Sequence, residues 1–298
     1  MKYISSSLLA IAVGALLVPQ NAQAAHSISG SYPTMSALDL ANALVGAGIT
    51  VTDATYTGAA LSAGTFSGAT PATAIPFSSG VMLSTGAIAN TVGPNNNDSI
   101  STPFGSAGYA PLDGLAGAAT HDAAVLQFKF KSSANVFSFQ YAFGSEEYTE
   151  YVNEGYNDAF GFFLSGPGIP TPINLAVLPD STPVTINNIN HTLGGHPAYF
   201  LNNDPSFGTP PWDNQLDGIV GGTIPLYASA AILPDTEYTI TIAIADSGDA
   251  AYDSAVFLRG DSFIAQAPPS AVPEPSTVIG GVALGALALR RVVRRKKA

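Results

Sequence analysis

The sequence contains no cysteine. This absence excludes disulfide bonds, thiol nucleophiles, iron–sulfur clusters and zinc sites built on cysteine. The fold must therefore be held by burial, by hydrogen bonds or by bound ions.

Basic residues are scarce in the central part of the chain. Of the ten Lys and Arg residues, one is Lys2 and six lie between positions 290 and 297. Residues 25–270 keep three basic residues against twenty acidic ones, a net charge of −17 for this stretch. A stretch with this net charge repels the phosphate backbone of nucleic acids, which argues against nucleic acid as a partner. It attracts cations instead. The alternative is that the acidity serves only to keep the protein in solution.

Common catalytic motifs are absent as well. There is no Gly-x-Ser-x-Gly, no His-Glu-x-x-His, no phosphate-binding loop and no dinucleotide fingerprint. Glu146 and Glu147 are adjacent, so on a strand they project to opposite faces and do not define the spaced carboxylate pair of a glycosidase. We expect a protein that is not an enzyme, and a secreted glycan-active enzyme is the alternative.

The N-terminus has the layout of an export signal. Lys2 precedes an apolar stretch from Leu8 to Val18, and residues 22–24 (Ala-Gln-Ala) form a small-x-small cleavage site. This order predicts a signal peptide over residues 1–24.

The C-terminus combines a short apolar run with a basic tail. The run, residues 278–289, has 12 residues; as a helix it would rise about 18 Å, against about 30 Å for a bilayer core. The basic residues that follow can extend to the membrane surface, so we expect a C-terminal transmembrane helix with its tail in the cytoplasm. The tail consists of Arg290, Arg291, Arg294, Arg295, Lys296 and Lys297. A Pro/Ala linker, residues 265–272, precedes this region.

Alternating apolar and polar residues predict an all-β domain over residues 25–264. "VLQFKFK" (125–131) and "NVFSFQYAF" (135–143) alternate strictly around a short turn and predict a hairpin. Further strands are expected at "DAFGFFLSGPG", "INLAVLP", "PVTINN", "EYTITIAIAD" and "SAVFLRG". One short N-terminal helix is expected at "SALDLANALVGAG", with Ser36 as its cap. The predicted fold is an antiparallel β-sandwich, jelly-roll-like in type.

Two acidic segments lie between predicted strands. They are "GSEEYTEYVNEGYNDAFGFF" and "IADSGDAAYDSAVF". Crowded carboxylates repel one another unless water, protons or a cation relieve the repulsion, and Ca²⁺ accepts many oxygen ligands in flexible geometry. A solvated acidic loop is the alternative. The candidate metal ligands are Glu146, Glu147, Asn157, Asp158, Asp246, Asp249 and Asp253.

The loop "GPNNNDS", residues 93–99, is also rich in oxygen ligands. Asn95, Asn97 or Asp98 could contact a cation or a sugar hydroxyl. A plain surface turn is the alternative.

The tail "VPEPST-VIGGVALGALAL-RRVVRRKK" resembles a PEP-CTERM sorting signal, with a Pro-Glu-Pro motif, a short apolar helix and an Arg-rich cluster in order over residues 273–298. The resemblance implies that Pro273, Glu274 and Pro275 are recognised by an exosortase. Exosortases are membrane-embedded cysteine protease-transpeptidases of bacteria that make extracellular polysaccharide.

The central part of the chain, from about Ser36 to Phe263, resembles the choice-of-anchor L domain of differently anchored bacterial surface proteins. The matching segments include "LANALVGAGITV", "YTGAALSAGTFSG", "GVMLSTGAIANTVGPN", "FSFQYAFGSEEYTEYVNEGYNDAFGFFLSGPG" and "YTITIAIADSGDAAYDSAVFL". The resemblance implies surface display and supplies no reaction or ligand.

Together these features predict an exported protein. We expect its tail to hold it transiently in the inner membrane before it reaches the cell surface or the extracellular matrix. There it would act as a structural or adhesive module that binds a cation or a polysaccharide. A permanently anchored inner-membrane protein is a further alternative.

Overall fold

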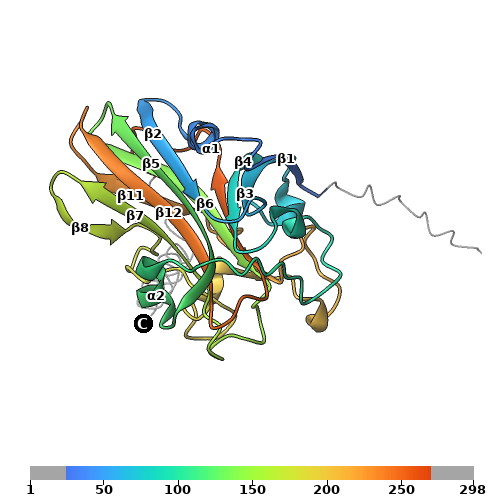
Figure 1. The fold of residues 1–298 in the computed structure, drawn as a ribbon. Coiled ribbons are helices and arrows are strands. Elements are labelled where there is room, and N and C mark those ends of the chain that lie inside the picture. The colour runs from blue at the N-terminus through green and yellow to red at the C-terminus, as the bar shows by residue number, and fades with distance from the viewer. Residues whose placement is uncertain (1–24, 270–298) are drawn as a thin grey trace, which may run out of the picture.

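Two antiparallel β-sheets form the frame of residues 25–269, the part of the chain that the computed structural model describes (Figure 1). The larger sheet has the order β1-β3-β4-β13-β6-β10-β9, and β11 also pairs with β6. Its strands are β1 (Ser27–Ser31), β3 (Ala63–Ser67), β4 (Ser79–Ser84), β13 (Ser254–Arg259), β6 (Val136–Ser145), β10 (Gly218–Val220), β9 (Phe200–Asn202) and β11 (Leu226–Ala231).

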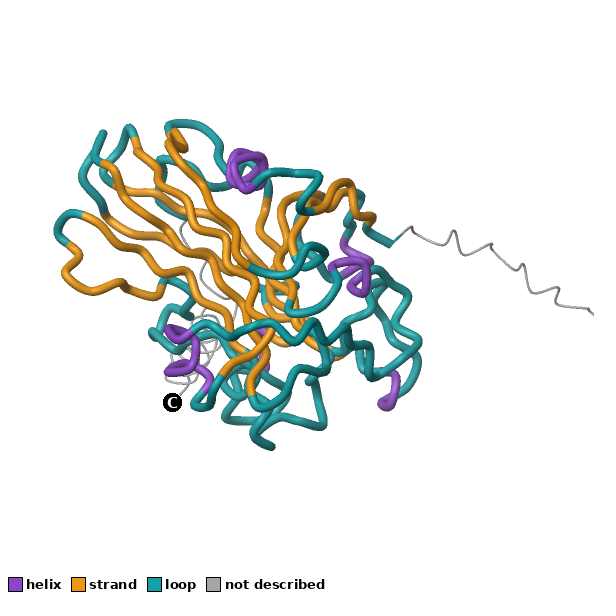
Figure 2. The backbone as a smooth tube through the Cα atoms, in the orientation of Figure 1, coloured by secondary structure: helices purple, strands orange, loops and turns teal. Residues whose placement is uncertain are grey.

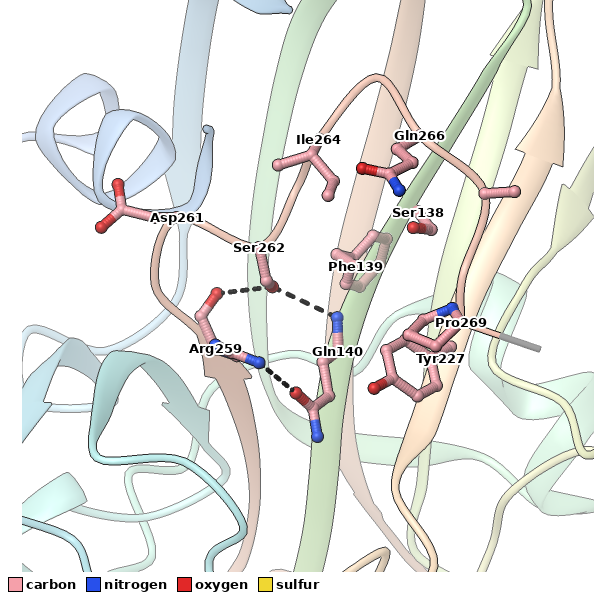
Figure 3. A pocket seen from close by; sticks show the side chains of 11 residues that line it. Ser138, Phe139, Gln140, Tyr227, Arg259, Asp261, Ser262, Ile264, Gln266 and Pro269 are labelled. Carbon is pink, nitrogen blue, oxygen red and sulfur yellow. Dashed lines mark hydrogen bonds between the residues drawn. The ribbon is translucent and has the colours of Figure 1, made fainter. Parts of the chain in front are cut away.

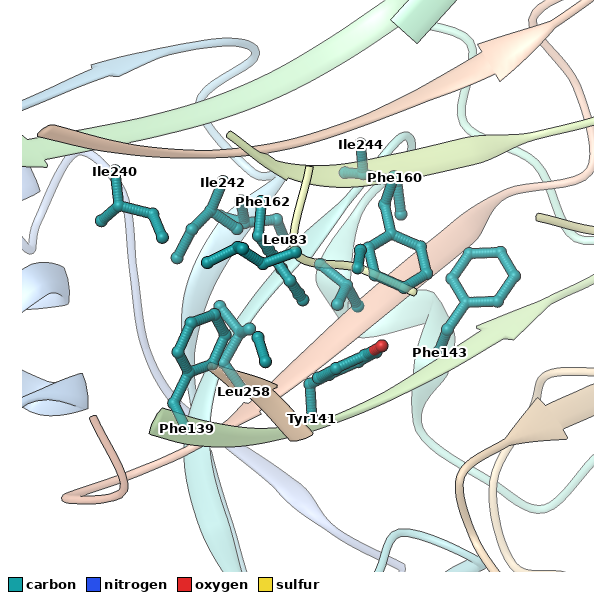
Figure 4. Close-up of a cluster of buried hydrophobic side chains, with 14 of the residues drawn as sticks. Leu83, Phe139, Tyr141, Phe143, Phe160, Phe162, Ile240, Ile242, Ile244 and Leu258 are labelled. Atoms are coloured by element: carbon teal, nitrogen blue, oxygen red, sulfur yellow. The ribbon is translucent and has the colours of Figure 1, made fainter. Parts of the chain in front are cut away.

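The smaller sheet has the order β2-β5-β12-β7-β8. Its strands are β2 (Ile49–Thr57), β5 (Thr120–Ser132), β12 (Glu237–Ser247), β7 (Ala159–Gly166) and β8 (Ile169–Asn174). The two sheets confirm the predicted all-β sandwich. Their apolar faces meet in one large core, in which phenylalanine, isoleucine and leucine side chains from both sheets interlock (Figure 4).

The predicted N-terminal helix is confirmed as α1 (Ala37–Leu44). Ser36 caps it: the Ser36 hydroxyl accepts a hydrogen bond from Asp39 N at 3.1 Å, and the Asp39 carboxylate accepts one from Ser36 N at 2.9 Å. Leu40 and Leu44 are buried, so the helix closes one side of the core. A second helix, α2 (Ala110–Ala116), begins with Pro111 in its first turn and was not predicted.

The predicted hairpin between residues 125–131 and 135–143 is wrong. β5 pairs with β2 and β12, whereas β6 pairs with β13, β10 and β11. The turn between β5 and β6 therefore carries the chain from one sheet to the other. The two aromatic faces meet across the core, and the rings of Phe130 and Phe137 lie 5.1 Å apart.

The strands predicted at "INLAVLP" and "PVTINN" are largely irregular loop. Only the beginning of the first belongs to β8, and an isolated bridge joins Val177 to Pro183. The Asn174 side-chain oxygen accepts hydrogen bonds from the backbone of Phe162 and Ala176, each at 3.0 Å, in place of a continuing ladder. Most apolar residues of this segment are still buried, namely Leu175, Ala176, Leu178, Val184 and Ile186. They give the sequence a strand-like pattern although no continuous strand forms.

The end of the described chain lies along β6 (Figure 3). Ile264 exchanges two backbone hydrogen bonds with Ser138, at 3.0 and 3.1 Å. A cavity of about 240 Å³ is lined by residues of β6 and of the chain end, and Arg259, Gln140 and Pro269 are among its lining residues. The start of the predicted linker is thus attached to the domain.

No helix within residues 25–269 is long and apolar enough to cross a membrane. The predicted signal peptide (1–24), the end of the linker and the predicted sorting signal with its transmembrane helix (273–298) lie outside the described residues.

Candidate functional site

The long loops gather at one end of the sandwich (Figure 2), and the acidic segments meet there. Strand pairing explains why. Ser145 at the end of β6 pairs with Ser254 at the start of β13, and Ala159 at the start of β7 pairs with Ala245 near the end of β12. The residues just beyond these pairs are the carboxylates Glu146, Glu147, Asp158, Asp246 and Asp253. We call these five residues, with Asp217 added below, the carboxylate cluster.

These carboxylates are buried. Glu146 and Asp158 are 0% exposed, Glu147 and Asp246 are 1% exposed, and Asp253 is 2% exposed. Burying an ionised carboxylate is costly unless a partner of opposite charge or several hydrogen bonds compensate for the lost water. The cluster therefore requires protons or positive charge to be stable in this position.

No lysine or arginine side chain in the described part of the chain is placed to supply that charge. Lys129 pairs with Asp53 at 3.8 Å, and Arg259 donates to Gln140 at 2.9 Å. Arg259 lies six residues beyond Asp253 on β13, about 20 Å along an extended strand. Lys131 lies at the opposite end of the smaller sheet, where its strand partner is Glu237.

Hydrogen bonds satisfy only part of the cluster. Asp158 accepts from Ser247 N at 2.9 Å and from the Ser254 hydroxyl at 2.6 Å. Asp253 accepts from Thr102 N and from the Asn90 amide, each at 3.0 Å. By contrast, four side chains keep buried oxygens without a hydrogen-bond partner: Glu146 and Glu147 (both oxygens each), Asp246 (Oδ1) and Asp217 (Oδ2).

Burial is the main cause of the altered acidity of the cluster. It raises the pKa of Glu146 well above its ordinary value, and the neighbouring charge of Asp217 raises it further. Burial likewise raises the pKa of Glu147, with the charge of Asp158 as the next cause, and that of Asp246, again with Asp158 next. Without a cation these groups favour the protonated form.

Asp217 is a member of the cluster that the sequence did not single out. It precedes β10, and Gly218 pairs with Ser145, so Asp217 stands beside Glu146 at the end of the sheet. It is 0% exposed, and its Oδ1 accepts a hydrogen bond from Asn95 Nδ2 at 2.7 Å. An isolated Asp-Gly pair before a three-residue strand gives no local signal of a site.

The other predicted ligands lie less centrally. Both polar atoms of the Asn157 amide are already used: Nδ2 donates to Ala116 O at 3.0 Å, and Oδ1 accepts from Asn187 N at 2.9 Å. Asp249 is exposed and accepts from Ala251 N. In the loop 93–99, Asn97 and Asp98 are exposed, whereas Asn95 is buried against Asp217.

The cluster is not a preformed metal centre. Within residues 25–269, no three acidic or histidine side chains converge at distances that could hold a metal ion. A cation would have to draw the unpaired carboxylates inward and take further ligands from backbone carbonyls and water. Ca²⁺ tolerates this kind of irregular coordination.

A cavity lies beside the lone tryptophan. Its volume is about 420 Å³, and Trp212, Phe77 and Pro71 are among its lining residues. Trp212 is half-buried and packs against the second apolar cluster of the domain. The indole ring therefore has a structural contact, and its free edge borders a largely apolar hollow.

Comparison with known proteins gives one match. The family profile of the choice-of-anchor L domain matches residues 30–264, which is most of the chain. No curated protein and no solved structure matches the chain.

Proposed function

The chain belongs to the choice-of-anchor L family, which indicates an exported, anchored protein of the cell surface, and from this premise we propose that it is a non-enzymatic display module that binds calcium. The observation that carries the proposal is the set of buried carboxylates at the loop end, several of whose oxygens have no hydrogen-bond partner. A divalent cation would neutralise them without any basic side chain. The module would act as a structural or adhesive unit, and its wider partner would be extracellular polysaccharide or matrix.

Calcium binding can be measured on the full-length chain, purified in mild detergent and freed of metal with a chelator. Isothermal titration with calcium is expected to give saturable heat. The double variant Glu146→Gln/Glu147→Gln is expected to lose it, whereas Asp53→Asn, an exposed carboxylate at the other end of the molecule, should bind like the wild type. Absence of heat with the wild-type chain, or unchanged binding in the double variant, would contradict the proposal.

We further propose that an exosortase sorts the protein through Pro273, Glu274 and Pro275. The support is the order of three elements in the sequence: the Pro-Glu-Pro motif, the short apolar run and the basic tail. On this proposal the tail holds the protein in the inner membrane only until it is processed.

Pro273→Ala tests the sorting proposal. The variant is expected to accumulate as full-length chain in the membrane fraction, whereas mass spectrometry of the wild type from the surface or matrix fraction should show a C-terminus near Pro275. Pro269→Ala, which lies before the motif, is the matched control and should be sorted normally. Unchanged localisation of Pro273→Ala would favour permanent anchoring in the inner membrane.

A glycan-active enzyme is the rival function. A glycan array and a reducing-sugar assay on the same preparation separate the two. Binding without release of reducing ends supports the module, and turnover supports the enzyme.

A further inference from the structure

A cavity of about 480 Å³ lies on the outer face of the smaller sheet, away from the core. Leu126 and Phe128 of β5 pack in the core, so Val125 and Gln127, which alternate with them and line the cavity, project to the opposite face. The volume falls within the range of about 300–1,000 Å³ that is usual for small-ligand pockets. None of the lining residues belongs to the carboxylate cluster.

One side of the cavity is part of a row of hydrogen-bonding side chains. Gln127 pairs with Thr55 of β2 on one side and with Thr241 of β12 on the other, so the three side chains stand level on the same face. Gln127 Nε2 donates to the Thr241 hydroxyl at 2.9 Å, which leaves the Gln127 side-chain oxygen and its second N–H available to a ligand. Thr55 and Gln127 are exposed. The row therefore offers both donors and acceptors.

The floor of the cavity is formed by smaller apolar side chains. Val125 and Ala123 follow Gln127 at intervals of two residues along β5, and both line the cavity. The partner of Val125 on β12 is Ala243, which is buried. These short side chains leave a hollow between the polar row and the segment 106–109.

The segment 106–109 forms the other side of the cavity and carries Tyr109. The Tyr109 ring lies 6.1 Å from the ring of Phe163. Burial raises the pKa of the Tyr109 phenol, and the nearby Thr241 hydroxyl partly offsets the rise. The aromatic ring is therefore placed over the sheet, close to the polar row.

Hydrogen bonds hold this segment in place before any ligand binds. Tyr109 N donates to the Thr120 hydroxyl at 2.9 Å. The Ser106 hydroxyl donates to Asp122 at 3.0 Å, and Ser106 N donates to the same carboxylate. A site that is already ordered loses less conformational entropy when it binds.

This combination of side chains fits a sugar. A sugar unit has a face of C–H groups, which packs on an aromatic ring, and a rim of hydroxyls, which exchange hydrogen bonds with amides and other hydroxyls. Tyr109 would supply the ring, and Gln127 and Thr55 would supply the hydrogen bonds.

The lining favours an uncharged sugar. None of the ten lining residues carries a charge. Lys129, two residues from Gln127 on the same face, already pairs with Asp53 at 3.8 Å. The net charge of −17 over residues 25–270 repels polyanions. Because the lining contains no carboxylate, it also lacks the acid and nucleophile pair that glycoside hydrolysis requires.

We propose that the cavity between β2, β5 and Tyr109 binds a sugar unit of a neutral polysaccharide. The inference rests on the proposed polysaccharide partner and deepens it, because it locates the binding site and defines the charge of the ligand.

Affinity electrophoresis tests the proposal. The full-length chain in mild detergent is run in native gels that contain a neutral polysaccharide (dextran, laminarin or galactomannan) or an anionic one (alginate or polygalacturonate). At least one neutral polysaccharide is expected to retard the wild-type chain, and the anionic ones are expected to leave its mobility unchanged. Retardation as a function of polysaccharide concentration gives the dissociation constant.

Variants then locate the site. Tyr109→Ala is expected to weaken binding about tenfold or more, the usual effect of losing a central aromatic contact. Tyr109→Phe keeps the ring and should bind nearly as well as the wild type. The double variant Thr55→Ala/Gln127→Ala changes only exposed side chains and should also weaken binding, which keeps the test valid if Tyr109→Ala fails to fold by circular dichroism. Trp212→Ala, beside the other cavity, is the matched control and should bind like the wild type.

Each contrary outcome has its own meaning. Unchanged binding in Tyr109→Ala, or a loss confined to Trp212→Ala, overturns the proposed site and leaves the polysaccharide partner standing. Retardation by the anionic polysaccharides alone overturns the neutral class of ligand. No retardation of the wild type by any of the five overturns both this inference and the polysaccharide partner, whereas calcium binding is decided by its own titration.

Discussion

At the scale of single residues, Gly86 allows close packing of a cluster carboxylate. It lies two residues after β4, and a Cβ at this position would overlap the carboxylate of Asp253. We expect Gly86→Ala to push that carboxylate away from Thr102 N and the Asn90 amide. The free energy of unfolding should fall by about 1–3 kcal/mol, as it does when a packed interior is overfilled. Urea unfolding of the purified chain measures this change.

Gly114→Ala is the matched control for Gly86→Ala. Gly114 lies within α2, and nothing stands within 4 Å of the added Cβ. The replacement should be neutral or stabilise by up to about 1 kcal/mol, because alanine favours the helix. Equal behaviour of the two variants would show that Asp253 is not held as the structure places it.

His26 provides a pH-dependent contribution away from the cluster. It is 1% exposed, its Nε2 lies 3.0 Å from the Thr91 hydroxyl, and the rings of Phe66 and Phe257 pack edge-on against it. Burial lowers the pKa of His26 to about 4. The unfolded chain therefore takes up this proton first, and the stabilising contribution is complete above about pH 6.5 and is lost as the pH falls toward 4.

The variant His26→Gln isolates this contribution. The difference in unfolding free energy between the wild type and the variant should shrink by a few kcal/mol, on the order of 3, between pH 7 and pH 4.5. Comparing the two chains cancels the carboxylates that also titrate there. Parallel pH profiles would show that His26 is protonated as readily in the folded chain as in the unfolded one.

At the scale of elements, the segment after β13 closes the core. Phe263 is 1% exposed, and its ring stacks on Phe137 at 4.8 Å and on Phe139 at 5.1 Å. Its backbone N donates to Leu44 O at 3.0 Å, which ties the segment to α1. The domain therefore includes this segment.

Phe263→Ala should cost about 3–5 kcal/mol of unfolding free energy, the usual loss for removing a buried aromatic ring. Chemical denaturation measures the loss. Phe207→Ala serves as the comparison because Phe207 is 71% exposed, and it should change stability very little. A small effect at Phe263 would mean that the segment belongs to the linker.

The same strands show what periodicity can and cannot predict. β5 alternates between buried and exposed residues over its second half, whereas β6, β12 and β13 are buried at almost every position. Apolar patterning correctly located all four strands, because each turns an apolar face to the core. It could not decide whether two such faces lie side by side in one sheet or oppose each other across two. The turn at residues 132–135 is short enough for a hairpin, and only the pairing of β5 with β12 and of β6 with β13, far along the chain, excludes it.

The site was predictable to a similar extent. Dense acidic segments identified the carboxylates that flank β6, β7, β12 and β13. Asp217 was missed because it is a lone acid that reaches the cluster only through the pairing of β10 with β6. Asn157 was included because of its position in an acidic segment, yet its amide holds the backbone near Ala116 and Asn187.

At the scale of the whole molecule, the buried carboxylates are kept apart from the lysine and arginine side chains of the described residues. The described basic residues lie along the middle and far parts of the strands, whereas the buried carboxylates lie at the loop end. If the acidity served only solubility, any salt would relieve it equally, because exposed charges are screened over about 3 Å at 1 M ionic strength. Salt screens buried charges much less. Stabilisation of the buried carboxylates would therefore indicate a bound ion rather than a general effect of ionic strength.

This difference predicts that sodium chloride cannot replace calcium. At free calcium about one hundred times the dissociation constant, binding to one site should stabilise the folded chain by about 2.7 kcal/mol. That corresponds to a rise in melting temperature of roughly 5–10 °C for a domain of this size. Thermal unfolding of the chelated chain should show this rise with millimolar calcium and little of it with sodium chloride at equal or higher ionic strength. Equal stabilisation by both salts would assign the acidity to the protein's surface and remove the need for a bound cation.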